Sequence, residues 1–468
     1  MPIENSPSND SHFDFRIPSA ESNLELALSC LTYLTFSELE EGMSEFEEDP
    51  LGLYSGRDFL KHIQQRNQFL AYAAIHWSDH VRQTEYEIQK HILWPAFWRV
   101  AASKRKIDLA QKILVSSDRE YQNWSGPLEI VAYHGFVVFA KELLNQGADS
   151  YRGHLNSALR AAASKGYEAV ARLLLDHGAD VNAVSGSRSV LAEAASKGHE
   201  AIVHLLLDYG ADVNFWCPFY GTALSTAVFH HHEAVVHLLL DYGADVNFAN
   251  GNSILPEAAS KGHEVIVRCL LDHGADINFR CPFYGTALGT AAFHRHEAVV
   301  RLLLDYGADV NFTNENSILQ EAASMGHEVI VRLLLDHGAD VNSRSPIYGT
   351  ALSVAAFRRH EAVVRLLLDY GADTANENSV LQEAASKGHE AIVRLLLDYG
   401  ADINSWSPVY GTALDTAVSH HHKAIVRLLL EYGADVNLQS PFYSTALSTA
   451  PRGSYPSSVR SWDRRPRR

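Results

Sequence analysis

Cysteine is scarce in this chain, with four residues among 468. Small secreted domains that depend on disulfide bonds are far richer in cysteine. Two of the four, Cys217 and Cys281, lie in the matching strings WCPFYG and RCPFYG, so they look like copies of one position. We therefore expect reduced thiols and no disulfide framework.

Long hydrophobic runs are also missing. No apolar segment approaches the roughly 18 to 20 residues that a membrane-spanning helix needs. The first residues, Met1 to Asp10, are polar and contain no Lys or Arg, so they do not resemble a secretory signal. We expect a soluble, intracellular protein in the cytoplasm that makes no contact with a membrane.

Sequence motifs for catalysis are absent as well. Neither GxxxxGK[ST], which would bind phosphate, nor HExxH, which would bind zinc, occurs. Three consecutive histidines begin at His230 and three more at His420, but these clusters lie six repeats apart, and zinc needs four ligands close together. We predict that the chain is not an enzyme, with no catalytic residue, no cofactor and no metal site.

Positive charge is in deficit, because the formal net charge is -17. Seven carboxylates crowd between Glu38 and Asp49, which is typical of a solvated loop. Nucleic acid is not an expected partner, since phosphate contacts need clustered Lys and Arg. Six Arg residues do fall in the last 18 residues, which end in RRPRR. We expect a disordered Arg-rich tail over 451–468, with nuclear import as an alternative role.

What the chain does contain is a repeat of about 33 residues, marked by the string LLDxGAD. Its glycine recurs at positions 178, 210, 243, 274, 307, 338, 371 and 400. In one copy, Thr350 can cap a first helix, and Val363, Val364, Leu366 and Leu367 form the apolar stripe of a second helix. Gly371 then ends that helix. Such a unit cannot cover its own apolar face, so neighbouring units must stack into a solenoid.

The repeat GTALxxAAxxxHEAVVRLLLDYGADVN resembles the ankyrin repeat, and it recurs about ten times over roughly residues 124 to 437. The resemblance implies an all-α ankyrin-repeat solenoid of about ten to eleven helix-turn-helix repeats. Where the family has Thr-Pro-Leu-His, this chain has Thr-Ala-Leu-Ser from Thr222 to Ser225. The family's His, which ties neighbouring repeats together, is therefore missing at that position.

We expect five segments along the chain. They are a disordered N-terminus (1–20), a small helical domain with an acidic loop (21–90), degenerate N-terminal ankyrin repeats (91–150), the main array (151–450) and the tail (451–468).

Two unlike repeats together form a unit of 64 residues, and its copies differ mainly in two places. The turn reads FWCPF (215–219), FRCPF (279–283), SRSPI (343–347) and SWSPV (405–409), whereas the second helix hardly changes. The first helix also varies, from STAVFHH (225–231) to SVAAFRR (353–359). The pattern indicates recognition by turns and first helices. The alternative is a recent duplication with too few differences to form a meaningful pattern.

The ankyrin resemblance implies that the first helices line a concave groove. On this template Thr226, Thr290 and Val354 face the groove, beside aromatic and basic residues that would anchor a partner. The predicted partner-binding residues are Phe229, His230, Lys261, Phe293, His294, Met325, Phe357, Arg358 and Lys387 on the first helices, and Trp216, Phe219, Tyr220, Phe283, Tyr284, Tyr348, Trp406 and Tyr410 in the turns. We expect an acidic or amphipathic protein partner, bound by a monomer.

A backbone feature accompanies these residues. His231, Arg295, Arg359 and His421 stand where the other repeats have the glycine that closes the first helix. We therefore expect left-handed backbone at four residues that are not glycine.

The N-terminal strings LELALSCLTYLTF (24–36) and FLAYAAIHWSDHV (69–81) resemble the segment that joins the NTPase module to the ankyrin array in fungal NACHT-ankyrin receptors of the STAND class. The ankyrin resemblance implies a non-enzymatic scaffold or recognition arm that binds a protein partner. The resemblance to the NACHT-ankyrin receptors implies an alternative function. The chain would then be a sensor subunit or fragment that acts with a separate NTPase chain.

Overall fold

The computed structural model describes residues 20–33, 76, 79–82, 90–101, 126–185, 188–217, 221–247, 254–281, 285–311, 317–345, 349–374 and 380–438. The chain divides into two compact units, Met1–Ala244 and Asp245–Arg468. The expected tail and the acidic run from Glu38 to Asp49 lie outside the described residues.

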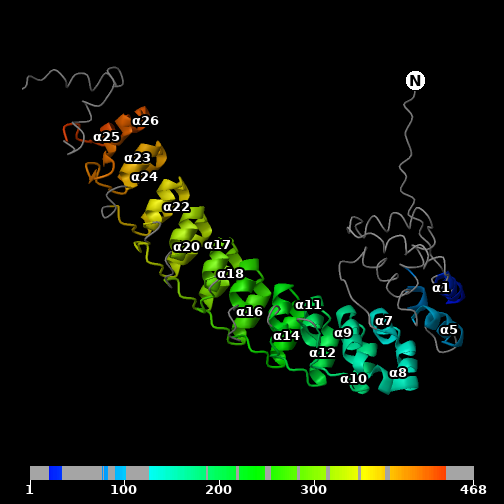
Figure 1. The fold of residues 1–468 in the computed structure, drawn as a ribbon. Coiled ribbons are helices and arrows are strands. Elements are labelled where there is room, and N and C mark those ends of the chain that lie inside the picture. The colour runs from blue at the N-terminus through cyan, green and yellow to red at the C-terminus, as the bar shows by residue number, and fades with distance from the viewer. Residues whose placement is uncertain are drawn as a thin grey trace, which may run out of the picture. The chain divides into compact units, whose positions relative to one another are not determined.

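Among the described elements of the first unit, α1 and α5 come before the regular repeats, and α1 lies against α5 (Figure 1). Helix pairs then follow one another along the chain. The described elements are α1 (Ala20–Tyr33), α5 (Lys90–Ala101), α7 (Pro127–His134), α8 (Val137–Tyr151), η1 (Arg152–His154), α9 (Leu155–Lys165), α10 (Glu168–Asp176), β1 (Val184–Ser185), β2 (Arg188–Ser189), α11 (Val190–Lys197), α12 (Glu200–Asp208), α13 (Ala223–Phe229) and α14 (Glu233–Asp241).

The second unit continues the same alternation of a first helix and a second helix in each repeat (Figure 1). Its described elements are α15 (Ile254–Lys261), α16 (Glu264–Asp272), α17 (Ala287–Phe293), α18 (Glu297–Asp305), α19 (Ile318–Met325), α20 (Glu328–Asp336), α21 (Ala351–Phe357), α22 (Glu361–Asp369), α23 (Val380–Lys387), α24 (Glu390–Asp398), β3 (Trp406–Ser407), β4 (Gly411–Thr412), α25 (Ala413–Ser419) and α26 (Lys423–Glu431).

Six of the described first helices begin at a Ser or Thr cap, namely α11, α13, α17, α19, α21 and α25, whereas α7 and α9 lack a side-chain cap. The side chain of Thr350 accepts a hydrogen bond from the backbone N–H of Ser353, which satisfies one of the donors at the helix start. Thr412 forms a complete capping box with Asp415. We call the repeats with α13, α17, α21 and α25 the TAL repeats, and those with α11, α15, α19 and α23 the alternate repeats.

The core lies between the helices of successive repeats. First helices pack on first helices, as α15 does on α17, and second helices on second helices, as α18 does on α20. In α22 the four residues of the predicted stripe, Val363, Val364, Leu366 and Leu367, are buried, and so is Leu368. Full burial of one such side chain contributes about 1.5 to 3 kcal/mol. Small Ala residues such as Ala355 and Ala356, both buried, allow the first helices to approach closely.

Glycine ends most second helices, and Gly371 has the expected left-handed backbone with φ of 82°. Helix α8 differs, because it continues through Gly147 as far as Tyr151. In this degenerate copy the GAD string is followed by Ser150 and Tyr151 instead of Val and Asn, so the usual turn does not form there.

Short antiparallel hairpins join the repeats. Strand β1 pairs with β2 through Val184 and Ser189, and β3 pairs with β4 through Trp406 and Thr412. Equivalent turns elsewhere are reduced to isolated bridges, such as that between Cys281 and Gly285. All four cysteines are buried, and none of them forms a disulfide bond.

A short segment before the repeats contacts the first of them. The guanidinium of Arg82 donates to the carbonyl of His134 at 3.2 and 3.1 Å, and it lies over the ring of Tyr167 at 5.3 Å. Burial, with the charges of Arg82 and Lys165 nearby, lowers the pKa of His134 to about 3. This histidine is therefore neutral at physiological pH.

Within the described ranges, every helix is too short or too polar to cross a membrane.

Candidate functional site

Three phenylalanines stand at the ends of the first helices in the TAL repeats. Phe229, Phe293 and Phe357 are the last residues of α13, α17 and α21. Their exposed fractions are 51%, 51% and 45%. Apolar side chains of this size are normally buried, so their repeated exposure marks a candidate contact surface.

Basic residues follow each of these aromatic side chains. His230, His294 and Arg358 cap the first helices at their C-terminal ends, and all three are exposed. The imidazoles of His230 and His294 meet the preceding Phe rings edge-on, with centroids 5.0 and 5.1 Å apart. Aromatic and cationic chemistry is thus adjacent at each helix end.

The next residue in each TAL repeat has left-handed backbone, as the sequence predicts. The φ angles are 61° at His231 and Arg295, 64° at Arg359 and 60° at His421. Arg295 and Arg359 were not among the predicted binding residues, although the absence of glycine at their positions was a usable signal. Both are well exposed, and each guanidinium pairs with a Glu two residues later, at 3.5 and 3.9 Å.

The alternate repeats contribute longer, flexible side chains. Met325 is 49% exposed at the end of α19, Lys387 is exposed at the end of α23, and Lys261 is half-buried. The ammonium of Lys387 lies 5.0 Å from the centre of the Phe357 ring in the preceding repeat. This cation–π contact brings two predicted residues together across a repeat boundary.

Three other expectations for the groove are wrong. Thr226, Thr290 and Val354 are buried, at 4%, 5% and 6% exposure, so they do not face a partner. The hydroxyl of Thr290 donates to the carbonyl of Thr286 at 2.7 Å, which satisfies its hydrogen-bonding needs inside the repeat stack. The close approach of neighbouring first helices covers these positions.

The predicted turn residues form a second group. Trp216 is exposed, and Trp406 and Tyr410 are half-buried. Burial and the carboxylate of Glu383 raise the pKa of Tyr410. The other predicted turn residues lie outside the described residues; they are Phe219, Tyr220, Phe283, Tyr284 and Tyr348.

Carboxylates and cations occupy different places in the alternate repeats. Glu257, Glu321 and Glu383 are half-buried, one helical turn before the helix ends. Burial raises the pKa of Glu257, and the charge of Lys261 opposes that shift.

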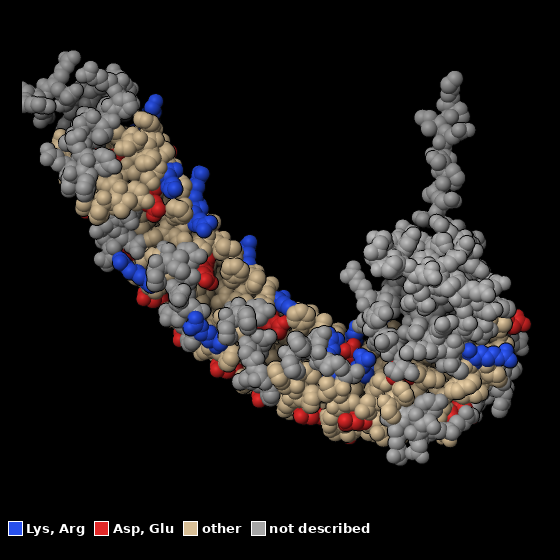
Figure 2. Space-filling view, viewed as in Figure 1, with Lys and Arg blue, Asp and Glu red and all other residues tan. Residues whose placement is uncertain are grey.

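Figure 2 shows Lys and Arg side chains projecting along one edge of the second unit.

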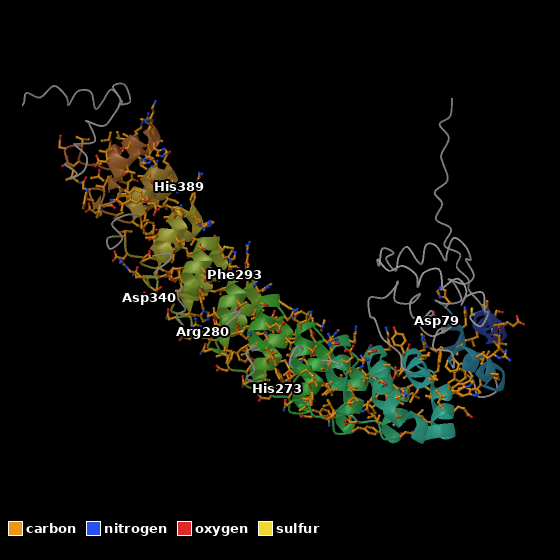
Figure 3. The ribbon with its side chains drawn as sticks, viewed as in Figure 1. Asp79, His273, Arg280, Phe293, Asp340 and His389 are labelled. Atoms are coloured by element: carbon orange, nitrogen blue, oxygen red, sulfur yellow. The ribbon has the colours of Figure 1, made fainter. Side chains whose placement is uncertain are left out.

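The two predicted groups do not share one surface in the second unit. In Figure 3 Phe293 lies toward one edge of that unit, whereas Arg280, which occupies the turn position equivalent to Trp216, lies toward the other. The first-helix ends and the turns are therefore separate candidate surfaces.

Histidines at the start of the second helices tie the repeats together. The Nε2–H of His296 donates to the carbonyl of Ser260 at 2.9 Å, and that of His360 to the carbonyl of Ser324 at 3.0 Å. His389 instead donates through Nδ1, to the carbonyl of Ala356 at 3.2 Å. These bonds link successive repeats.

The histidine-rich ends do not assemble a metal site. In the described part of the chain, no three His, Cys, Asp or Glu side chains are placed to hold a metal ion. His230 and His232 do stack, with ring centroids 6.2 Å apart, but His232 donates to the carbonyl of Ser196 at 3.1 Å.

Stacked helix pairs with glycine-ended second helices and capped first helices define a class of repeat protein whose exposed surfaces recognise other molecules. The family model described as "Ankyrin repeats (3 copies)" matches residues 98–185, 184–250, 255–345, 311–378 and 352–440. The chain belongs to the ankyrin-repeat family. Ankyrin repeats are generally protein-interaction modules and are typically not enzymes.

Among solved structures, the chain is similar to the crystal structure of the human ASB11 ankyrin repeat domain. The sequences are 30% identical, the match covers 46% of this chain and 98% of that one, and the TM-score is 0.42. Comparison with curated proteins gives no match.

Proposed function

We propose that this chain is a non-enzymatic scaffold or recognition arm that binds a protein partner through its first-helix ends and its turns. The observation that carries the proposal is the exposure of Phe229, Phe293 and Phe357 at one position of three TAL repeats. Aromatic and Arg side chains are the residue types that most often dominate binding energy at protein interfaces.

The nearby basic residues suit the same role. His230, His294 and Arg358 flank the aromatic rings, and Met325 and Lys387 extend the surface into the alternate repeats. Methionine adapts its shape to different partners, which favours its use at binding surfaces. Among the turn residues, Trp216, Trp406 and Tyr410 would contribute a separate contact. We expect the chain to act as a monomer in the cytoplasm.

An alternative function is that of a sensor subunit or fragment that acts with a separate NACHT or STAND NTPase chain. It rests on the resemblance of the strings at 24–36 and 69–81 to the segment that precedes the array in such receptors. ATP-dependent co-purification with a NACHT protein would favour this alternative over a free-standing scaffold.

The direct test is affinity capture followed by mass spectrometry. The wild-type chain is compared with a variant carrying Phe229→Ser, Phe293→Ser and Phe357→Ser, after circular dichroism has shown equal helicity. We expect the variant to lose a defined subset of partners, because truncation of aromatic anchors at an interface commonly costs 2 kcal/mol or more.

A matched control removes exposed apolar side chains from the second helices. Val265→Ser and Val329→Ser change residues that are also exposed, on α16 and α20. Partners that persist in this control but vanish in the Phe variant place binding at the first-helix ends. An identical partner list for all three proteins would exclude those ends as the binding surface.

A further inference from the structure

In the second unit, aromatic and cationic side chains form a row along the ends of the first helices. We call Phe293, Arg295, Phe357, Arg358, Arg359 and Lys387 the aromatic–basic row. Its members come from α17, α21, α23 and the residues just after α17 and α21. All six are exposed.

The row consists of two clusters, each with one Phe and at least one Arg. Phe293 and Arg295 form one cluster, and Phe357, Arg358 and Arg359 form the next, two repeats later. Lys387 completes the second cluster through its contact with the Phe357 ring. The cations outnumber the aromatic rings, so an apolar ligand group placed here would have positive charge on its flanks.

Two cations of the row, Arg295 and Arg359, stand on left-handed backbone, which is strained for residues other than glycine. Both residues are left-handed, whereas the alternate repeats use Gly262, Gly326 and Gly388 at the same step. The ion pairs of the two arginines with Glu297 and Glu361 are exposed, and such pairs add little stability. Strain that a fold could avoid with glycine is found where side chains serve function.

Carboxylates near the row favour one ligand charge. Glu297 and Glu361 engage Arg295 and Arg359 at distances above 3.4 Å, which leaves these arginines accessible to a stronger acceptor. Glu321 on α19 is half-buried one turn before the helix end. The exposed arginines would repel a cationic ligand, whereas the carboxylates of an acidic ligand would form ion pairs with them.

We propose that the aromatic–basic row binds an extended, acidic segment of the protein partner in which apolar residues flanked by carboxylates recur about every six residues. The spacing follows from the geometry. Neighbouring helices lie about 10 Å apart, so clusters two repeats apart are separated by roughly 20 Å. An extended chain rises about 3.3 Å per residue, and about six residues span that distance. This inference rests on the proposed function.

Nucleic acid is the competing polyanion. The chain carries a net charge of -17, and single-stranded nucleic acid needs a continuous basic path along its backbone. The row instead alternates cations with apolar rings. A protein segment with carboxylates around an apolar side chain matches this alternation better.

The test uses fluorescence anisotropy with the full chain and labelled synthetic peptides. The probe carries two Glu-flanked Phe residues about six residues apart, joined by Gly and Ser. One comparison peptide has the same composition with the two Phe residues adjacent, and another has Lys in place of Glu. A single-stranded oligonucleotide of similar length serves as a third comparison. We expect the spaced acidic peptide to bind most tightly, and its binding to weaken as salt increases.

The decisive variant carries Arg295→Gly and Arg359→Gly. It removes two cations and also relieves left-handed strain, so weaker binding cannot be attributed to unfolding. We expect about three- to tenfold weaker binding of the spaced peptide, together with an unchanged or higher Tm. The control is Arg301→Glu with Arg365→Glu, which alters exposed cations on α18 and α22 of the same repeats and should leave binding unchanged.

Three results would each overturn the inference. Equal binding of spaced, adjacent and Lys-containing peptides would reject the acidic spacing rule, and tighter binding of the oligonucleotide would reject a protein ligand for this row. Unchanged binding by the Arg→Gly variant would reject the location. In each case the capture experiment with the Phe→Ser variant still tests the proposed function separately, because it detects partners of any charge or spacing.

Discussion

The position of one histidine ring decides whether a repeat can carry a side chain at the end of its first helix. A Cβ added to Gly326 would lie 2.6 Å from Nδ1 of His360, whose Nε2–H holds the carbonyl of Ser324. One repeat later, the first helix ends at Arg359 instead of glycine. The histidine that faces this helix end, His389, bonds through Nδ1 and not through Nε2, and its acceptor is the carbonyl of Ala356. The alternation of glycine and arginine therefore follows the alternation of histidine geometry.

This account predicts different costs for two substitutions with similar backbone angles. Gly326→Ala should destabilise the chain by about 2 kcal/mol, because it adds left-handed strain and displaces the His360 ring from its hydrogen bond. Gly307→Ala should cost about 1 kcal/mol, since φ is also positive but nothing lies within 4 Å of the added Cβ. Urea unfolding followed by circular dichroism measures both. Equal costs would show that the histidine ring does not constrain the site.

At the residue scale, backbone conformation was easier to predict from the sequence than side-chain burial was. The left-handed residues were predictable because four non-glycine residues fall at a position that is glycine in sister repeats, and the φ angles confirm them. The burial of Thr226 was missed. A template places this residue on the helix face toward the groove, but coverage depends on how closely the neighbouring helices approach, and that distance is set by several buried Ala residues together.

At the scale of elements, part of the variation in the turns has a packing cause. Gln320 on α19 donates to the carbonyl and hydroxyl oxygens of Ser343 at 2.7 and 3.1 Å, and Gln382 does the same to Ser405 at 2.8 and 3.0 Å. Where the first helix of an alternate repeat lacks Gln, the turn has Phe instead of Ser. The four matched pairs are Ala192 with Phe215, Pro256 with Phe279, Gln320 with Ser343, and Gln382 with Ser405.

Because the first turn residue varies together with a packing partner, its variation is no evidence of recognition. The third turn residue, Cys217, Cys281, Ser345 or Ser407 in the four copies, is buried. Among the described turn residues, two variable positions are left at the surface. One is the second position, occupied by Trp216, Arg280, Arg344 and Trp406, and the other is the fifth position of the last copy, Val409, which is 73% exposed. Variation alone could not separate packing from recognition, because both change the same short strings.

Tyrosine and aspartate link the second helices of successive repeats. The hydroxyl of Tyr306 donates to Asp272 at 2.6 Å, and that of Tyr370 donates to Asp336. These hydrogen bonds are the main reason that the pKa of each tyrosine is raised. The stabilisation is therefore complete below the pKa of an unfolded tyrosine, near 10, and is lost as pH rises through the higher folded-state pKa.

We predict that the wild-type chain loses stability above about pH 10 more steeply than a variant with Tyr306→Phe and Tyr370→Phe. The variant lacks the two hydroxyls, so it has less stabilisation to lose. Urea midpoints measured from about pH 8 to about pH 11 give the comparison. Parallel curves for the two proteins would mean that the tyrosine–aspartate bonds do not contribute to folding.

At the scale of the whole molecule, the period of the sequence was enough to predict the fold. Most copies repeat a hydroxyl cap, an apolar stripe and a terminal glycine, so errors at single residues do not alter the architecture. The exception is α8, where a degenerate copy lost the residues that turn the chain after Gly147. The binding residues remain predictions, because one fold carries many functions and the choice of partner depends on a few exposed side chains.

Because each repeat packs mainly on its neighbours, a destabilising substitution should affect nearby repeats more than distant ones. In a repeat array each unit contacts mainly its nearest neighbours, as α19 does with α17 and α21, so stability is close to a sum of local terms. Gly326→Ala should therefore accelerate amide hydrogen exchange in α19 to α22, which surround the lesion. It should leave exchange in α9 to α12 of the first unit unchanged. Mass spectrometry of peptic fragments resolves these regions, and acceleration of equal size in both would mean that the two units unfold as one cooperative structure.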